Sequence, residues 1–103
     1  METVYVRSND KYLRTAIDEI LYLEAAGSYL KLVTIRGEYS LSQNLSQFMR
    51  KNPISALQRV HRSFVVNLKK VDSFDSQFIY ISEFKIPMGQ THKVNFMTRI
   101  HCL

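Results

Sequence analysis

Three short segments of the sequence each combine a long cationic side chain with hydroxyl or amide hydrogen-bond donors. They are AAGSYLK (25–31) with Ser28 and Lys31, QRVHRS (58–63) with Arg59, Arg62 and Ser63, and MGQTHK (88–93) with Gln90 and Lys93. Hydroxyl groups and lysines suit phosphate oxygens, whereas arginine and glutamine can make two hydrogen bonds to a base edge. The three sets therefore indicate contact with DNA. Ordinary polar loops can have the same composition, and the sequence does not show whether the sets share one face.

Residues that could carry out catalysis or bind a metal do not form a recognisable set. The histidines are dispersed, at His61, His92 and His101, and Cys102 has no partner at a zinc-site spacing. Asp18 and Glu19 are adjacent, as expected for a turn rather than an acid/base pair. The three glycines stand too far apart to cradle a phosphate. We expect no enzyme, no metal site and no cofactor.

The positive charge is concentrated in the middle of the chain. The formal net charge is +5, yet no acidic residue lies between Glu38 and Asp72. That stretch carries six cations, Arg50, Lys51, Arg59, Arg62, Lys69 and Lys70. A local excess of one sign favours a polyanionic partner, because binding to phosphates releases counterions. Charge alone leaves three readings open: nucleic acid, a membrane surface and a solvated basic face.

Length and composition set the class of protein. The chain has 103 residues, enough for a single domain with one modest core, and 46% of them are hydrophobic. One cysteine fits a reducing compartment, and no run approaches the ~20 apolar residues of a membrane-spanning helix. The start of the chain lacks a secretory signal pattern. We expect a cytoplasmic domain that does not bind membranes.

The spacing of apolar residues predicts a mainly β fold. Alternation in VYVRS, KYLRTAI, EILYLEAAG, SYLKLVTI and EYSLS predicts strands that form a β-meander, with a tight turn at Arg36-Gly37. Strands resume in ALQRVHRS, FVVNLKKVDSF and QFIYISEFKIP, with DSFDSQ as a polar turn. Phe78 and Tyr80 are expected to alternate with Ile79 and Ile81 in one arm of a hairpin.

Two segments have helical rather than strand spacing. In SQNLSQFMRKNP the apolar residues Leu45, Phe48 and Met49 predict a helix of about two turns that packs on a sheet, with Ser42 as N-cap and Pro53 closing it. The tail THKVNFMTRIHCL has three apolar residues at helical spacing, Val94, Met97 and Ile100. It predicts a short C-terminal helix.

In combination, these segments are similar to a known family. DEILYLEAAGSYLKLVT (18–34), then a small helix, QRVHRSFVVNLKKV (58–71) and KIPMGQTHK (85–93) resemble the LytTR-type DNA-binding domain of bacterial response regulators. The resemblance runs from about Val4 to Ile100, and the order and spacing of its parts match throughout. An Ile-x-Tyr-x-Glu strand followed by Arg-x-His-Arg-Ser-Phe-x-Val-Asn is much more specific than either part alone.

The resemblance implies a fold and a mode of binding. The fold would be elongated and mostly antiparallel β with one short α-helix. Domains of this family bind double-stranded DNA through loops and strand ends that enter successive major grooves. They usually follow a phosphoacceptor receiver domain at the C-terminus of a transcription factor, and they recognise paired promoter repeats, an arrangement that a homodimer on DNA would match.

Carried over to this sequence, the resemblance assigns roles to particular residues. Ser28, Tyr29 and Lys31 would contact the groove and phosphates, and Arg62 takes the position that faces a base, with Ser63 as a phosphate donor. His61 is either a DNA contact or a packed residue that holds the loop. Arg59, Lys69 and Lys70 add positive charge, with the two lysines expected to bind all sequences alike.

The third segment departs from the family pattern. Gly89-Gln90-Thr91-His92 stands where family members commonly have serine followed by arginine or lysine. Losing an arginine removes a two-bond guanine contact, so Gln90 or His92 would read another base, or Lys93 would supply only charge.

Together these features predict sequence-specific binding of double-stranded DNA by the output domain of a two-component regulator. Residues 1–103 would be one domain, excised from the C-terminus of a larger protein that carries a receiver domain. The main alternative is a module that keeps the fold but binds or dimerises with protein. RNA binding is a weaker third alternative, because the sequence lacks the aromatic-basic motifs of known RNA modules.

Overall fold

Ten strands and two α-helices make up residues 3–103, the part of the chain that the computed structural model describes. The strands are β1 (Thr3–Ser8), β2 (Lys11–Ala16), β3 (Ile20–Ala26), β4 (Tyr29–Thr34), β5 (Gly37–Leu41), β6 (Leu57–His61), β7 (Phe64–Asn67), β8 (Ser73–Phe74), β9 (Phe78–Ile81) and β10 (Phe84–Pro87). The helices are α1 (Leu45–Lys51) and α2 (Gln90–Arg99), with short 3-10 turns at Ile17–Glu19 and Leu68–Lys70. The predicted mainly β fold with two helices is confirmed.

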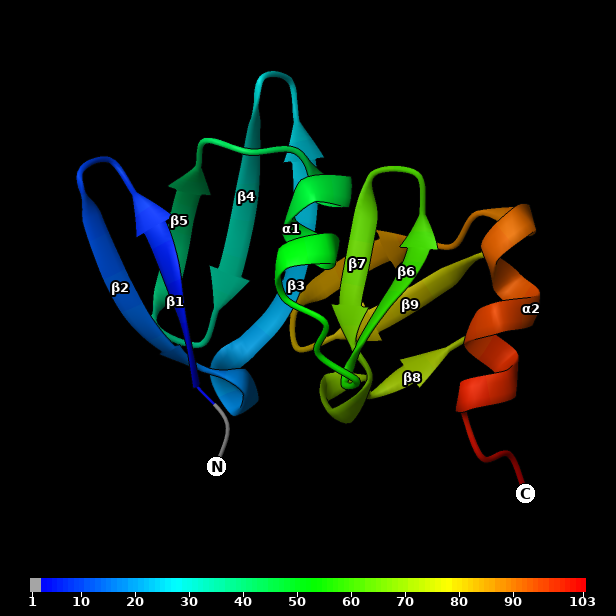
Figure 1. The fold of residues 1–103 in the computed structure, drawn as a ribbon. Coiled ribbons are helices and arrows are strands. Elements are labelled where there is room, and N and C mark those ends of the chain that lie inside the picture. The colour runs from blue at the N-terminus through cyan, green and yellow to red at the C-terminus, as the bar shows by residue number, and fades with distance from the viewer. Residues whose placement is uncertain (1–2) are drawn as a thin grey trace.

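A five-stranded antiparallel sheet in the order β5-β4-β3-β7-β6 forms the middle of the molecule. The predicted meander is present only as β3-β4-β5, because β1 and β2 form a separate hairpin. The third sheet has the order β10-β9-β8. Figure 1 shows α1 and the β1–β2 hairpin on one face of the central sheet and β8 to β10 behind it, so the fold has three layers.

Strand β3 is buried on both faces, which is why its sequence is almost continuously apolar. Ile20 and Leu23 belong to the hydrophobic cluster beneath α1 and the β1–β2 hairpin. Leu21 and Tyr22 belong to the second cluster, which packs against β9, β10 and α2. Two cores thus hold the central sheet rigid, and its turns project from a fixed support.

Helix α1 begins two residues later than its sequence suggested. The expected N-cap, Ser42, lies outside the helix, and Asn44 caps it instead by accepting a hydrogen bond from the Gln47 amide at 2.8 Å. The Gln47 side chain in turn accepts from the Asn44 amide at 3.1 Å. This reciprocal pair satisfies two free helix amides, which a serine two residues earlier does not reach.

Helix α2 confirms the predicted C-terminal helix, but its buried face differs. The apolar spacing pointed to Val94, Met97 and Ile100, whereas Val94 is 69% exposed and Phe96 is fully buried. Phe96 packs edge-to-face on Phe74 at 5.1 Å between ring centroids. A large aromatic ring buries more surface than Val94 on the opposite side of the helix, so it sets the orientation of the helix. Of the three expected residues, Ile100 packs against the second cluster.

The segment after β7 is not a continuous strand to Phe74, as its sequence suggested. The chain leaves the sheet at Asn67, whose fully buried side chain donates to the carbonyls of Ile17 (3.0 Å) and Ile20 (2.9 Å). Its oxygen accepts from the Lys69 amide, which bends the chain into a 3-10 turn. Within the expected polar turn, Ser73–Phe74 forms the short strand β8.

The described residues measure 44 × 30 × 25 Å along their principal axes. Figure 1 shows the long direction running from the β1–β2 hairpin to α2. No helix among residues 3–103 has the length and apolar character needed to cross a membrane.

Candidate DNA-binding edge

The three polar segments singled out in the sequence lie along one edge of the molecule. Figure 1 shows the β3–β4 turn, the β6–β7 turn and the beginning of α2 at the upper edge. We call this set, residues 27–29, 61–63 and 89–93, the loop edge. The sequence could not show that the segments converge, and the sheet topology brings them together because β3 and β7 are neighbouring antiparallel strands.

Backbone hydrogen bonds join the three segments. The amide of Ala25 at the end of β3 donates to the carbonyl of Ser63 at 2.8 Å. On the other side, the amide of Gly89 donates to the carbonyl of Val60 at 2.7 Å. The β6–β7 turn is therefore fixed between its two neighbours, and the loop edge is one continuous surface.

The guanidinium of Arg59 makes hydrogen bonds within the protein rather than projecting into solvent. Its guanidinium donates to the carbonyl of His61 at 3.3 Å, to the hydroxyl of Ser46 at 3.2 Å and to the carbonyl of Arg62. A planar guanidinium suits such a multiple contact, because its donors point in fixed directions. Arg59 thus ties the β6–β7 turn to the beginning of α1.

His61 likewise holds the turn. Its Nδ1 accepts a hydrogen bond from the Ser63 amide at 3.1 Å, and its ring packs edge-to-face on Phe64. Partial burial lowers the pKa of His61 below its ordinary 6.5, and the nearby charges of Arg62, His92 and Arg59 lower it further. The ring is neutral at pH 7, with Nδ1 free to accept. Of the two roles considered for His61, the geometry supports holding the turn.

Arg62 and Ser63 form the tip of the β6–β7 turn, and they differ from Arg59. Arg62 is exposed, and within residues 3–103 its guanidinium makes no hydrogen bond or ion pair. Its backbone is held by Arg59, and that of Ser63 by His61 and Ala25. A free cation thus projects from a fixed backbone, the arrangement that a base or phosphate contact requires.

The β3–β4 turn presents two of its three expected residues. Gly27 has φ +64°, a left-handed conformation in which a side chain is unfavourable, and it exposes Ser28 and Tyr29. Lys31 lies further along β4, where its ammonium pairs with Glu24 at 3.2 Å and with Glu38 at 3.8 Å. The hydrogen bond to Glu24 raises the pKa of Lys31. Its charge is locally compensated, unlike that of Arg62.

The third segment is the N-terminus of α2. Gly89 is its N-cap without a side-chain hydrogen bond, and a Cβ there would lie 3.5 Å from the Cα of His61, in ordinary contact. Gln90 is exposed, while His92 and Lys93 are half-buried. The free amides and the positive dipole end of the helix lie on the loop edge, where they favour an anion. Lys93 adds its charge to the same turn of helix.

Lys69 and Lys70 lie away from the loop edge. They follow β7 in the 3-10 turn Leu68–Lys70, at the end of that strand opposite to Arg62. Figure 1 shows this turn at the lower side of the molecule. Of the six cations in the acid-free stretch, Arg62 lies in the loop edge, and Arg59 lies next to it in β6. Lys93, from outside that stretch, adds a further cation to the loop edge.

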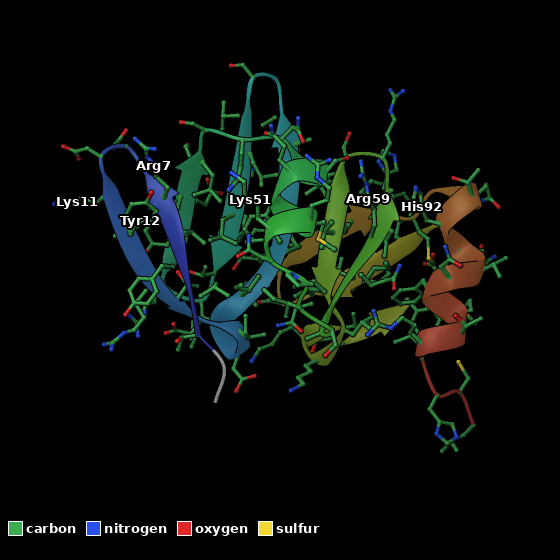
Figure 2. The ribbon with its side chains drawn as sticks, viewed as in Figure 1. Arg7, Lys11, Tyr12, Lys51, Arg59 and His92 are labelled. Carbon is green, nitrogen blue, oxygen red and sulfur yellow. The ribbon has the colours of Figure 1, made fainter. Side chains whose placement is uncertain are left out.

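The sequence reasoning did not single out the β1–β2 turn. Figure 2 shows its Arg7 and Lys11 in the upper part of the molecule, together with Lys51, Arg59 and His92. Both side chains lie outside the acid-free stretch, so the charge pattern did not mark them. The available signal was the alternation of tyrosine with cations in YVR and KYLR.

Comparisons with known proteins identify the family of the chain. The sequence profile described as the LytTr DNA-binding domain matches residues 10–101. The transcriptional regulatory protein YpdB of Escherichia coli is 29% identical over 107 residues, covering 97% of this chain and 44% of that protein. An uncharacterized response regulatory protein of Vibrio cholerae is 29% identical over 84 residues, covering 73% of this chain and 32% of its own. The chain thus spans less than half of these relatives.

A solved structure shows the same fold. It is the LytTr DNA-binding domain of a putative methyl-accepting/DNA response regulator from Bacillus cereus, with a TM-score of 0.77, 19% sequence identity and 95% coverage of each chain. The family profile covers most of residues 3–103, and the fold matches a structure of that family over 95% of each chain. The chain belongs to the LytTR family of DNA-binding domains.

Proposed function

We propose that this domain reads double-stranded DNA sequence specifically through the loop edge, as the output part of a response regulator. One observation carries the proposal above all. Arg62 projects without a partner from a turn whose backbone three neighbours hold, by way of Arg59, Ala25 and the His61 ring. Because the backbone of the turn is already fixed, binding would have to order only the Arg62 side chain, which favours specific contact over diffuse attraction.

Within the loop edge, different groups serve different parts of DNA. Arg62 and Gln90 suit base edges in the major groove, Arg62 by two hydrogen bonds to guanine and Gln90 by two to adenine. Ser28, Tyr29, Ser63 and Lys93 suit phosphates, as do the free amides of α2. His92 is half-buried beside Gly89, and it would contact a base or a phosphate next to Gln90.

Three expected contacts change role in this proposal. Arg59 and His61 act as positioning residues, because their polar atoms bind the turn itself. Lys31 contributes less than expected, since a phosphate contact would compete with two carboxylates. Exposed ion pairs are worth about 0–1 kcal/mol, so this competition is weak and Lys31 remains a secondary contact.

The relatives indicate the larger context. They are named as transcriptional or response regulatory proteins and are more than twice as long as the matched region. We therefore infer that residues 1–103 are one domain of a longer regulator, with a receiver domain before it. On paired promoter repeats two copies would bind, one per repeat.

Selection from a random pool of DNA duplexes tests the proposal. The domain should enrich one motif, and its log affinity should fall linearly with log salt. Arg62→Ala should weaken binding to that motif by about 1–3 kcal/mol and relax the preference at one base pair. Arg14→Ala is the matched control, because it removes an exposed arginine from the far end of the β1–β2 hairpin. It should keep both affinity and motif.

Two results would count against the proposal. Salt-sensitive binding without an enriched motif would indicate only a nonspecific basic face. It would support the alternative that the domain binds protein. An unchanged motif and affinity in Arg62→Ala would show that another residue reads the DNA.

A further inference from the structure

A groove of about 370 Å³ lies between the β1–β2 hairpin and α1. The hairpin supplies one wall, and the β5–α1 loop and the end of α1 supply the other. Its lining residues are Tyr5, Arg7, Tyr12, Ser42, Gln43, Lys51 and Asn52. The three segments of the loop edge contribute nothing to this groove, so it is a separate site.

The chemistry of the lining suits an anion. Every lining side chain carries an N–H or O–H donor, and none carries a carboxylate. Among residues 3–103, Arg7 and Lys51 form no ion pair, in contrast to Lys31 and Arg36. Two uncompensated cations face one groove, and these residue types are the ones that contact phosphate oxygens in protein–DNA complexes.

One residue of the lining, Gln43, has a buried side-chain oxygen. Its Oε1 is buried and has no hydrogen-bond partner within the described residues. A buried polar atom without a partner is costly, at about 1–3 kcal/mol. Rotation of the carboxamide by half a turn exchanges this oxygen for the NH₂ group, which could then donate to an anion in the groove. In that orientation an anion in the groove would be the acceptor for the NH₂ group, whereas the oxygen itself, as an acceptor, could not bind one.

The position of the groove identifies the source of the anion. Figure 2 shows Arg7, Lys11 and Lys51 in the same upper part of the molecule as Arg59 and His92. The described chain is 44 Å long, which corresponds to about 13 base pairs of DNA at 3.4 Å each. A duplex lying on the loop edge along this direction would extend past the β1–β2 turn.

We propose that the groove between the β1–β2 hairpin and α1 binds a backbone phosphate of the DNA that flanks the sequence read by the loop edge. Arg7 and Lys51 supply the charge, Tyr12, Ser42 and Gln43 supply neutral donors, and Lys11 adds attraction at the turn. The groove reads no base, so it lengthens the footprint without changing the motif. This inference rests on the proposed function.

The test compares two duplexes that carry the selected motif, one with long flanks on both sides and one trimmed on the hairpin side. Footprinting of the bound domain identifies that side. Arg7→Ala with Lys51→Ala should weaken binding to the long duplex by about three- to tenfold and lower the salt slope by about one to two phosphates. On the trimmed duplex the variant and the unaltered domain should bind alike.

Arg14→Ala with Lys85→Ala is the matched control, since it removes the same charge from exposed positions outside the groove. It should show no dependence on flank length. Both variants are expected to fold, because all four replaced side chains are exposed and polar at their tips. Thermal unfolding of each variant checks this. The selected motif should be the same for each.

Three outcomes overturn the inference. In the first, the Arg7→Ala, Lys51→Ala variant binds the long duplex as tightly as the control variant does. In the second, it loses as much affinity for the trimmed duplex as for the long one. Alternatively, inorganic phosphate could shift the groove resonances in NMR while flank length has no effect, which would make the groove a site for a free anion. If the unaltered domain enriches no motif, the proposed function fails first, and that result is distinct from these three.

Discussion

The two ends of β7 carry similar charge and differ in how the chain uses it. At one end, Arg59 and His61 hold a turn from which Arg62 projects freely. At the other end, the buried side chain of Asn67 donates to the carbonyls of Ile17 and Ile20, where the chain enters β3. Lys69 and Lys70 follow Asn67 in the 3-10 turn. In the proposed binding mode, positive charge in the sequence does not by itself mark a DNA contact. What distinguishes the first end is a fixed backbone beside a free cation.

Replacement of Asn67 should have the largest effect of these predictions, and that effect should be on the stability of the fold. Asn67→Ala leaves the carbonyls of Ile17 and Ile20 buried without a donor, and it should lower the free energy of unfolding by about 2–4 kcal/mol. Chemical denaturation measures it. The folded fraction should keep its DNA motif. A loss of motif preference in a folded Asn67→Ala domain would mean that the two ends are not separate in function.

Arg59 should have an intermediate effect, through the position of the turn. Arg59→Ala removes three hydrogen bonds and should cost about 1 kcal/mol of stability, with faster hydrogen exchange at the Ser63 amide. Arg59→Lys keeps the charge but lacks the forked donors. Because the role is positional, both variants should lose DNA affinity to a similar degree. Full recovery of affinity in Arg59→Lys, with exchange at Ser63 still fast, would instead indicate a direct phosphate contact.

The pH dependence of His61 should be a smaller effect. Its pKa is lowered on folding, so the unfolded chain takes up the proton first as the pH falls below about 6.5. The stability that neutral His61 provides is thus present above pH 6.5 and decreases as the pH falls through its lower folded pKa. NMR titration should show the Ser63 amide signal changing together with the His61 ring. In His61→Gln the stability should vary less over this range, and an equal variation would assign the pH dependence to another group.

The smallest effect is expected for Lys69 and Lys70. Replacing both by alanine should change affinity by about threefold or less at moderate salt, because screened charges more than a Debye length from DNA interact weakly. The selected motif should not change. Binding assays at two salt concentrations measure this, and a loss as large as that of Arg62→Ala would place the lower end of β7 on the DNA.

Local patterns in the sequence predicted much of the fold. Alternating apolar residues located the strands. The turn expected at Arg36-Gly37 lies one residue earlier, at residues 35–36, and Gly37, at φ +141°, is the first residue of β5 and pairs with Thr34. Helix α1 follows from Leu45 and Phe48, which are both buried. These features depend on neighbours within a few residues. The family resemblance added the expectation of an elongated, mostly antiparallel fold, but not the order of the strands in the sheets.

Features that depend on distant residues could not be predicted. The ion pairs of Lys31 join side chains from β3, β4 and β5, so they follow from strand register. The orientation of α2 depends on which side chain, Phe96 or Val94, finds a partner in the second core. The groove beside Arg7 exists because the β1–β2 hairpin packs next to α1, and no local pattern encodes that proximity.

NMR mapping with bound DNA tests directly whether the loop edge is the surface that contacts the duplex. The domain would be titrated with a duplex that carries the selected motif, and amide shifts would be followed along the chain. The largest shifts are expected in the loop edge, at residues 27–29, 61–63 and 89–93, and small shifts at the 3-10 turn Leu68–Lys70. Large shifts around Leu68–Lys70, with the β6–β7 turn unaffected, would contradict it.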